Sequence, residues 1–147
     1  AVESAAAGCA GIILQFPIYA GIMAIMRESG LTNLLAASIL ELSTPSTLPV
    51  LTFLIAAIIN MFVPSGGGQW SVQGPIVLDA GAAAGVAPGS MCMSVAYGDQ
   101  LTNMLQPFWA LPLLGITGVK ARDIVGYTSV VMLAGGLWIS VWLLILA

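Results

Sequence analysis

Long stretches without any charged side chain are the feature that most limits how this chain can fold. The three basic and six acidic residues leave uncharged runs at 4–26, 42–78, 80–98, 100–119 and 124–147. A helix needs about 20 mainly apolar residues to cross the hydrocarbon layer of a membrane, and several of these runs reach that length. Charged residues make up 6% of the chain, whereas they make up roughly 25% of an ordinary soluble domain. The sequence therefore predicts an all-α membrane protein.

Interruptions of the apolar pattern divide the chain into five predicted segments. They are a transmembrane helix over 1–30, a surface helix and linker over 31–47, a re-entrant hairpin over 48–86, a broken transmembrane helix over 90–119 and a transmembrane helix over 123–147. The surface helix has apolar residues at helical spacing but is too short to span a bilayer. Pro107 and Pro112 interrupt the broken helix, because proline removes a helical hydrogen bond.

Two interpretations fit the 48–86 segment, in which Pro64 and three glycines, Gly66–Gly68, separate two short apolar stretches. The segment is one long kinked span, or it is a hairpin whose tip stops near the middle of the bilayer. Three consecutive glycines disfavour a helix, so we expect a hairpin with a non-helical tip. Such backbone survives at membrane depth only where it is buried in protein or lines a cavity.

Several kinds of function are excluded by residues that the sequence lacks. It has no histidine, and its two cysteines, Cys9 and Cys92, lie in separate apolar runs, so we expect neither a transition-metal site nor a disulfide. It has no basic patch for nucleic acid. It has no phosphate-binding loop, nucleotide fingerprint or serine elbow, so we expect no enzyme activity and no cofactor other than a coupling ion. The positive-inside rule places the loop with Lys120 and Arg122 in the cytoplasm.

Two clusters of polar residues accompany the interruptions of the apolar pattern. Their members are Asn60, Ser65, Gly66, Gly67, Gly68, Gln69 and Gln73 in the first cluster, and Asp99, Thr102, Asn103 and Gln106 in the second. A broken helix leaves N–H groups unpaired at the start of one half-helix, where they attract a carboxylate. It leaves C=O groups unpaired at the end of another, where they coordinate sodium together with side-chain oxygens. The clusters therefore indicate a site for an anion and a cation.

Each of these residues also has a purely structural interpretation. An ionised Asp99 within a span needs a partner, water or an ion, so it is a sodium ligand, a proton carrier or a group that fixes the broken helix. Otherwise it is a carboxylate near the membrane interface that bonds to a loop. Asn60 and Asn103 either contact a ligand or cap a broken helix. The glycine run either lets a ligand approach the backbone closely or forms a tight turn.

At these two clusters the sequence resembles the short-chain fatty acid transporter family, which imports acetoacetate and butyrate-like acids. The resemblance is carried by GIILQFPIYAGIM (Gly11–Met23), NMFVPSGGGQWSVQGPI (Asn60–Ile76), AYGDQLTNMLQPFWALPLLGI (Ala96–Ile116) and KARDIVGY (Lys120–Tyr127). It implies that this chain, which begins abruptly, is a fragment, the C-terminal third of a longer protein. It also implies one half of an inverted repeat, in which a re-entrant hairpin precedes a broken helix.

The resemblance further implies which residues contact the substrate and which the coupling ion. Substrate contact is expected from Ser65, Gly66, Gly67, Gly68, Gln69 and Asn103, ion coupling from Asn60, Asp99 and Thr102, and sodium ligation from Ser65, Asp99, Thr102 and Asn103. Carriers of dicarboxylates often have Ser-Asn-Thr at the hairpin tip, whereas this chain has Ser65-Gly66-Gly67. Sodium ligands at this tip are therefore expected to be backbone carbonyls.

We therefore predict secondary active transport of short-chain fatty acids, coupled to Na+ or H+, by a multi-pass protein of the cytoplasmic (inner) membrane. The alternatives are a carrier for other small carboxylates such as C4-dicarboxylates, or a channel-like or non-transporting membrane subunit. The expected partners are the carboxylate substrate, the lipid bilayer, the N-terminal repeat of the same protein and a second copy in a homodimer.

Overall fold

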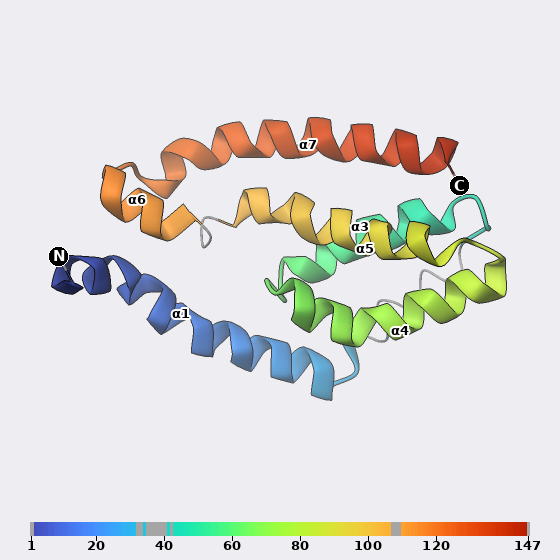
Figure 1. Cartoon of the computed structure of the whole chain (residues 1–147), viewed down its shortest axis with the longest axis horizontal. Helices are drawn as coiled ribbons and strands as arrows, with labels where there is room; N and C mark the ends of the chain where they lie inside the picture. Colours follow the sequence, from blue (N-terminus) through green and yellow to red (C-terminus); the bar gives the residue numbers. More distant parts are fainter. Residues whose placement is uncertain (1, 32–33, 35–40, 42, 107–109, 147) are drawn as a thin grey trace.

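The computed structural model describes residues 2–31, 34, 41, 43–106 and 110–146, and its regular elements are all helices (Figure 1). They are α1 (Val2–Glu28), α3 (Leu48–Asn60), α4 (Gly66–Ala84), α5 (Pro88–Thr102), the 3-10 turn η1 (Asn103–Leu105), α6 (Leu111–Thr117) and α7 (Ala121–Ile145). The prediction of an all-helical protein is confirmed for this part of the chain. The predicted surface helix falls largely outside the described residues.

Helices α3, α4 and α5 form the core of the molecule. The α3 and α5 helices run parallel and make the most extensive contact between any two elements, while α4 runs antiparallel to both (Figure 1). Their apolar side chains share a buried cluster that consists of Leu48, Ala56, Val77, Met91 and Val95. Proline stands in the first turn of α3 and of α5, where its missing N–H costs no helical hydrogen bond.

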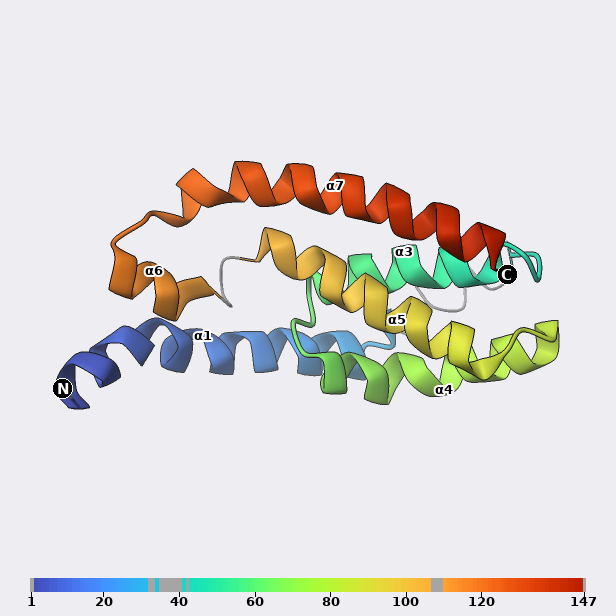
Figure 2. The same ribbon diagram turned by 45° about the horizontal axis from the view of Figure 1, so that its top comes forward.

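Helix α7 lies on one side of the α3–α5 pair, and α1 and α4 lie on the opposite side of this pair (Figure 2). Leu143 near the end of α7 packs in one cluster with Val50 and Phe53 of α3. Farther back along α7, Gly136 lies close to Leu101, because a Cβ built on Gly136 would stand 3.2 Å from the Leu101 side chain. The start of α3 is therefore level with the end of α7, and the end of α5 is level with its middle.

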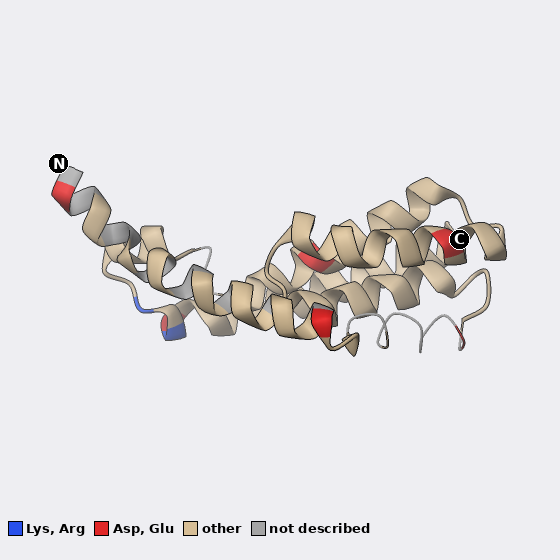
Figure 3. Cartoon of the chain, turned by 90° about the horizontal axis from the view of Figure 1, so that it is seen from below, with Lys and Arg blue, Asp and Glu red and all other residues tan. Residues whose placement is uncertain are grey.

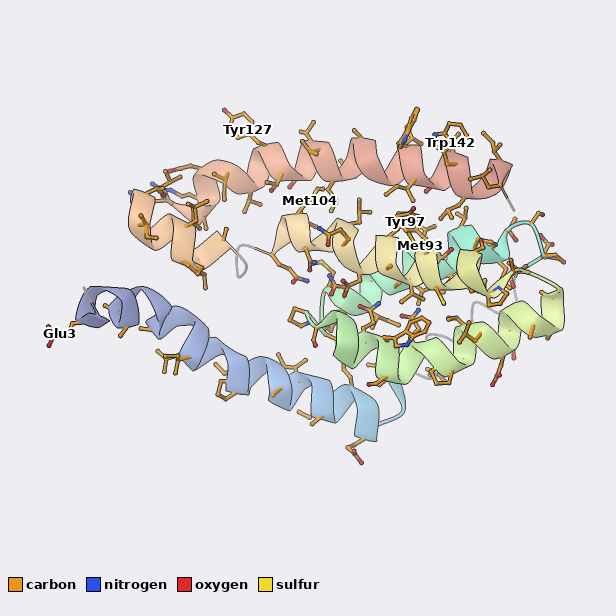
Figure 4. All side chains as sticks on the ribbon, in the orientation of Figure 1. Glu3, Met93, Tyr97, Met104, Tyr127 and Trp142 are labelled. Atoms are coloured by element: carbon orange, nitrogen blue, oxygen red, sulfur yellow. The ribbon has the colours of Figure 1, made fainter. Side chains whose placement is uncertain are left out.

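Helix α7 has the length and composition of a membrane span. Among the described residues, Ala121–Ile145 is the one helix long and apolar enough to cross a membrane. Leu143, which is 8% exposed, is its only buried residue. Tyr127 and Trp142 point outward from it (Figure 4) and are 79% and 44% exposed. The ribbon coloured for basic residues lies in the turn before this helix and at its start (Figure 3).

The tip between α3 and α4 differs from the prediction. Gly66, Gly67 and Gly68 form the first turn of α4, so the expectation of non-helical glycines is wrong, and the chain leaves helical geometry only over 61–65. Ser65 caps α4 with extended backbone, and its Oγ accepts a hydrogen bond from Gly68 N–H at 3.3 Å. Because amides in the first turn have no helical partner in any case, a cap can start a helix on glycine.

The predicted broken helix is built from three pieces. α5 ends at Thr102, η1 continues over Asn103–Leu105, and α6 begins only at Leu111. Pro112 stands in the first turn of α6, so it helps to start a helix rather than to break one. Re-entry of the α3–α4 hairpin into a membrane, and its place in an inverted repeat, stay predictions.

Candidate functional site

The side chain of Asn60 connects the end of α3 to the end of α5. Asn60 is fully buried, and its Nδ2 lies 2.7 Å from the Asp99 carbonyl oxygen, 3.0 Å from Thr102 Oγ1 and 2.9 Å from Asn103 Oδ1. The contact with the Asp99 carbonyl fixes the amide orientation, because an oxygen in that place would face another oxygen. Three residues around the end of α5 are thus arranged about one residue of α3.

Two further hydrogen bonds run in the opposite direction, from side chains at and after the end of α5 to carbonyls of α3. Thr102 Oγ1 donates to the Ala57 carbonyl at 3.0 Å, and Gln106 Nε2 donates to the Asn60 carbonyl at 2.7 Å. The last carbonyls of a helix have no partner within it. Here the parallel helices α3 and α5 end at the same level, and side chains from each of the two segments bond to carbonyls of the other.

The carboxylate of Asp99 lies against the amino end of α4. A Cβ built on Gly66 would stand 3.4 Å from Asp99 Oδ2 and 3.6 Å from Oδ1. Gly68 N–H is bonded to Ser65 Oγ, and the amides of Gly66 and Gly67 have no partner among the described residues. The start of a helix carries a partial positive charge. The acidic side chain and the positive helix end therefore face one another.

Three buried oxygens around this junction lack a hydrogen-bond donor within the described part of the chain. They are Asn60 Oδ1, Asp99 Oδ1 and Gln106 Oε1. Buried polar atoms are nearly always paired, so each unpaired one calls for an explanation. All three are acceptors: Asn60 stands at the carboxyl end of α3, which carries negative partial charge, whereas the Asp99 carboxylate faces the positive end of α4. Oxygens of this kind can hold a small cation such as sodium.

The predicted site residues fall into two groups in the structure. Asn60, Asp99, Thr102 and Asn103 are brought together by hydrogen bonds, and Gly66 borders the Asp99 carboxylate. Ser65 and Gly68 are joined to each other as the cap of α4, and Gly67 has open space where its Cβ would be. These positions leave the predicted roles of the residues as predictions.

Gln69, by contrast, points into the α3–α4 interface and not toward the tip. It is 1% exposed, and its Nε2 donates to the Ala56 carbonyl at 2.9 Å and to Gln73 Oε1 at 3.0 Å. The amide nitrogen is thus engaged within the hairpin. Its predicted contact with substrate would have to come from its backbone or from a rearranged side chain.

Three polar residues that received no individual role from the sequence take part in these arrangements. Gln106 bonds to the end of α3, Gln73 accepts a hydrogen bond from Gln69, and Thr52 is buried on α3. The spacing of Gln69 and Gln73 was a usable signal, because residues four apart lie on one face of a helix. No such signal marks Thr52, since its partner helix is distant in sequence.

The fold and this junction define a class of protein: a helical membrane protein in which a hairpin tip meets an interrupted helix. The model of the family described as "Short chain fatty acid transporter" matches residues 1–146, and the chain belongs to this family. The described residues contain no group of three or more His, Cys, Asp or Glu that could hold a metal ion, so amide and hydroxyl oxygens are the available ligands beside Asp99.

Two curated relatives have the same printed name, "Putative short-chain fatty acid transporter". The one from Escherichia coli (strain K12) is 48% identical over 136 residues, which are 92% of this chain and 31% of the relative. The one from Haemophilus influenzae is 47% identical over 127 residues, which are 86% of this chain and 28% of the relative. The chain thus spans less than a third of their length, in their C-terminal part. No solved structure matches.

Proposed function

We propose that this chain is part of a secondary active transporter that carries short-chain monocarboxylates across the inner membrane together with Na+ or H+. The observation that carries the proposal is the meeting of the α3–α4 tip with the end of α5, where the Asp99 carboxylate borders Gly66 and Asn60 bonds to Asp99, Thr102 and Asn103. The printed names of the two relatives support the substrate class.

The junction offers groups of opposite polarity to an anion and a cation. The unpaired amides at the start of α4, contributed by Gly66 and Gly67, suit a carboxylate. The unpaired oxygens of Asn60, Asp99 and Gln106 suit a cation. A carrier that couples two ions of opposite charge needs both kinds of group within a short distance. The remaining two-thirds of the protein would supply the other half of the site.

The proposed substrate is a small monocarboxylate because the junction has few strong anion-binding groups. The described basic side chains are Lys120, just before α7, and Arg122, in its first turn, and Arg122 pairs with Asp123 at 3.6 Å. A second carboxylate on the substrate would need a further positive group. Helix amides suit a single carboxylate, and the apolar surroundings suit a short alkyl chain.

The depth of the junction supports its role in transport. Helix α7 has 25 residues, which makes it roughly 37 Å long and sufficient for a bilayer. Leu101 lies beside Gly136, near the middle of this helix. If α7 spans the membrane, the end of α5 and the hairpin tip lie near the middle of the bilayer, where carriers with discontinuous helices bind their substrates.

The proposal is tested by uptake of labelled butyrate and acetoacetate into vesicles that contain the full-length protein. We expect saturable uptake that is accelerated by an inward gradient of Na+ or of H+, and competition by unlabelled monocarboxylates. Asp99→Asn should reduce ion-driven uptake by about tenfold or more, because it removes the one acidic side chain at the junction. Asp79→Asn is the matched control, since Asp79 is exposed on α4, about 20 Å along the helix from Gly66.

Two results would contradict the proposal. Uptake that rises linearly with concentration and ignores both gradients would indicate a channel. Gradient-dependent uptake that is the same in Asp99→Asn and in the unmodified protein would remove the junction from the coupling site.

A further inference from the structure

We propose that Asp99 also controls the order of binding: without a bound cation its carboxylate lies beside the amino end of α4 and repels the substrate's carboxylate. A cation that binds at the junction neutralises Asp99 and frees the helix end, so the cation binds first and the acid second. The proposal rests on the proposed function, because it takes a monocarboxylate as the substrate.

The first support is the place of the Asp99 carboxylate. Both of its oxygens lie beside Gly66, at 3.4 and 3.6 Å from the position of a Cβ, although the amides of Gly66 and Gly67 have no partner among the described residues. Glycine at this position keeps side-chain atoms from separating the carboxylate and the helix end. A substrate carboxylate that approached the same amides would therefore meet a negative charge.

The second support is the lack of a compensating positive side chain within the described part of the chain. No ion pair of Asp99 occurs there, and the described salt bridge, between Arg122 and Asp123, lies in the first turn of α7. Asp99 Oδ1 is buried without a hydrogen-bond donor. The partial charge of the α4 start is therefore the main electrostatic partner of Asp99, and a substrate anion would compete for it.

The third support is a set of acceptors that can hold a cation beside Asp99. Asn60 is fully buried and is bonded to the Asp99 carbonyl at 2.7 Å, and its Oδ1 remains unpaired. Gln106, whose Nε2 is bonded to the Asn60 carbonyl at 2.7 Å, also has an unpaired buried oxygen. A cation that these oxygens share with Asp99 would neutralise the carboxylate without occupying the amides of α4.

The experiment is equilibrium binding of butyrate to the purified full-length protein, with sodium chloride or with choline chloride at the same ionic strength. For the unmodified protein we expect sodium to tighten butyrate binding by about 5- to 150-fold, and butyrate to tighten sodium binding by the same factor. For Asp99→Asn we expect tight butyrate binding in choline chloride, with a sodium effect below about twofold, because the competing charge is gone.

Matched variants separate this charge effect from a general loss of structure. Asp99→Glu keeps the charge and should keep the sodium dependence. Asp79→Asn removes a charge from the exposed face of α4 and should behave like the unmodified protein. If Asp99→Asn does not fold, rapid mixing of the unmodified protein decides the order: butyrate should bind quickly only after sodium has been added.

The possible failures are distinguishable. Butyrate binding to Asp99→Asn in choline chloride that is no tighter than to the unmodified protein would overturn the proposed order and leave the transport function standing. Equal butyrate affinity of the unmodified protein with and without sodium would do the same. No saturable butyrate binding under any condition would contradict the proposed substrate, and the binding order with it.

Discussion

Helix α3 packs against α5 and against α4 through interfaces of two different kinds. At the α3–α5 interface the backbones touch at Gly98: a Cβ there would meet the Phe53 carbonyl oxygen and would stand 2.6 Å from Ala56 Cβ and 2.7 Å from Ala57 N. Hydrogen bonds cross this interface, and one of them runs from Thr102 Oγ1 to the Ala57 carbonyl at 3.0 Å.

Between α3 and α4, in contrast, the described hydrogen bond is the one from Gln69, and three buried polar groups of these two helices remain unpaired. Thr52, Gln69 and Gln73 are at most 1% exposed, and Thr52 Oγ1, Gln69 Oε1 and Gln73 Nε2 have no partner among the described residues. Gln69 bonds to the Ala56 carbonyl, and the two helices are antiparallel. Gln73 lies one turn after Gln69 on α4, and Thr52 lies one turn before Ala56 on α3. Because the helices are antiparallel, Gln73 and Thr52 stand at the same height.

The difference between the two interfaces indicates that α5 is held more firmly against α3 than α4 is. A buried polar atom without a partner costs roughly 1–3 kcal/mol, and such atoms occur both on α4 and at the junction with α5. The hydrogen bonds differ, since several join α3 to the α5 segment and the described one from α4 comes from Gln69. The close approach at Gly98 and the bonds of Asn60 instead favour one fixed alignment of α3 and α5. The two helix ends that would bind the cation thus belong to a fixed pair, while α4, with the proposed anion-binding amides, is the more easily displaced.

Among changes at these two interfaces, Gly98→Ala is expected to lower the free energy of unfolding most. The added Cβ would collide with backbone atoms of α3, which cannot rotate away as a side chain can. We expect a loss of about 3 kcal/mol or more in the free energy of unfolding, measured as a lower melting temperature and a broadened size-exclusion profile in detergent.

Gly89→Ala is the control for that change, because a Cβ at Gly89, in the first turn of the same helix, has nothing within 4 Å. It should melt within a few degrees of the unmodified protein. Similar melting temperatures for the two variants would mean that α3 and α5 are not in backbone contact.

A smaller effect is expected from Asn60→Ala, which removes the donor shared by the end of α5. The Asp99 carbonyl, Thr102 Oγ1 and Asn103 Oδ1 would each lose a contact of 3.0 Å or less. We expect a loss of about 2–3 kcal/mol, measured by thermal unfolding in detergent. Asn103→Ala, which removes one of these contacts from a half-buried residue, should cost about 1 kcal/mol. Equal losses would show that Asn60 is not the centre of the cluster.

The sequence predicted the membrane helix and the chain breaks because their signals are local. The uncharged run 124–147 corresponds to α7, and prolines stand near the starts of α3, α5 and α6. The glycine run was misjudged, because helix propensity describes interior positions and does not apply to a first turn capped by Ser65.

The site could be predicted only as a list of polar residues near breaks. That Asn60 lies beside Asp99 depends on a contact between residues 39 apart in the chain, and no local pattern encodes it. The inward orientation of Gln69 has the same origin, since a carbonyl of α3 accepts its hydrogen bond. The helical spacing of Gln69 and Gln73 gives their common face but not the helix that this face meets.

The smallest change in the free energy of unfolding is expected from Thr52→Val. Its sign shows whether the buried Thr52 hydroxyl lacks a hydrogen-bond partner. The change replaces an unpaired buried hydroxyl by a methyl group of similar shape, so the free energy of unfolding should stay level or rise by up to about 1 kcal/mol. Thr128→Val is the matched control: the Thr128 hydroxyl donates to the Val125 carbonyl at 3.1 Å, so its loss should destabilise slightly. If thermal unfolding instead shows Thr52→Val to be the more damaging of the two, the Thr52 hydroxyl has a hydrogen-bond partner in the folded protein.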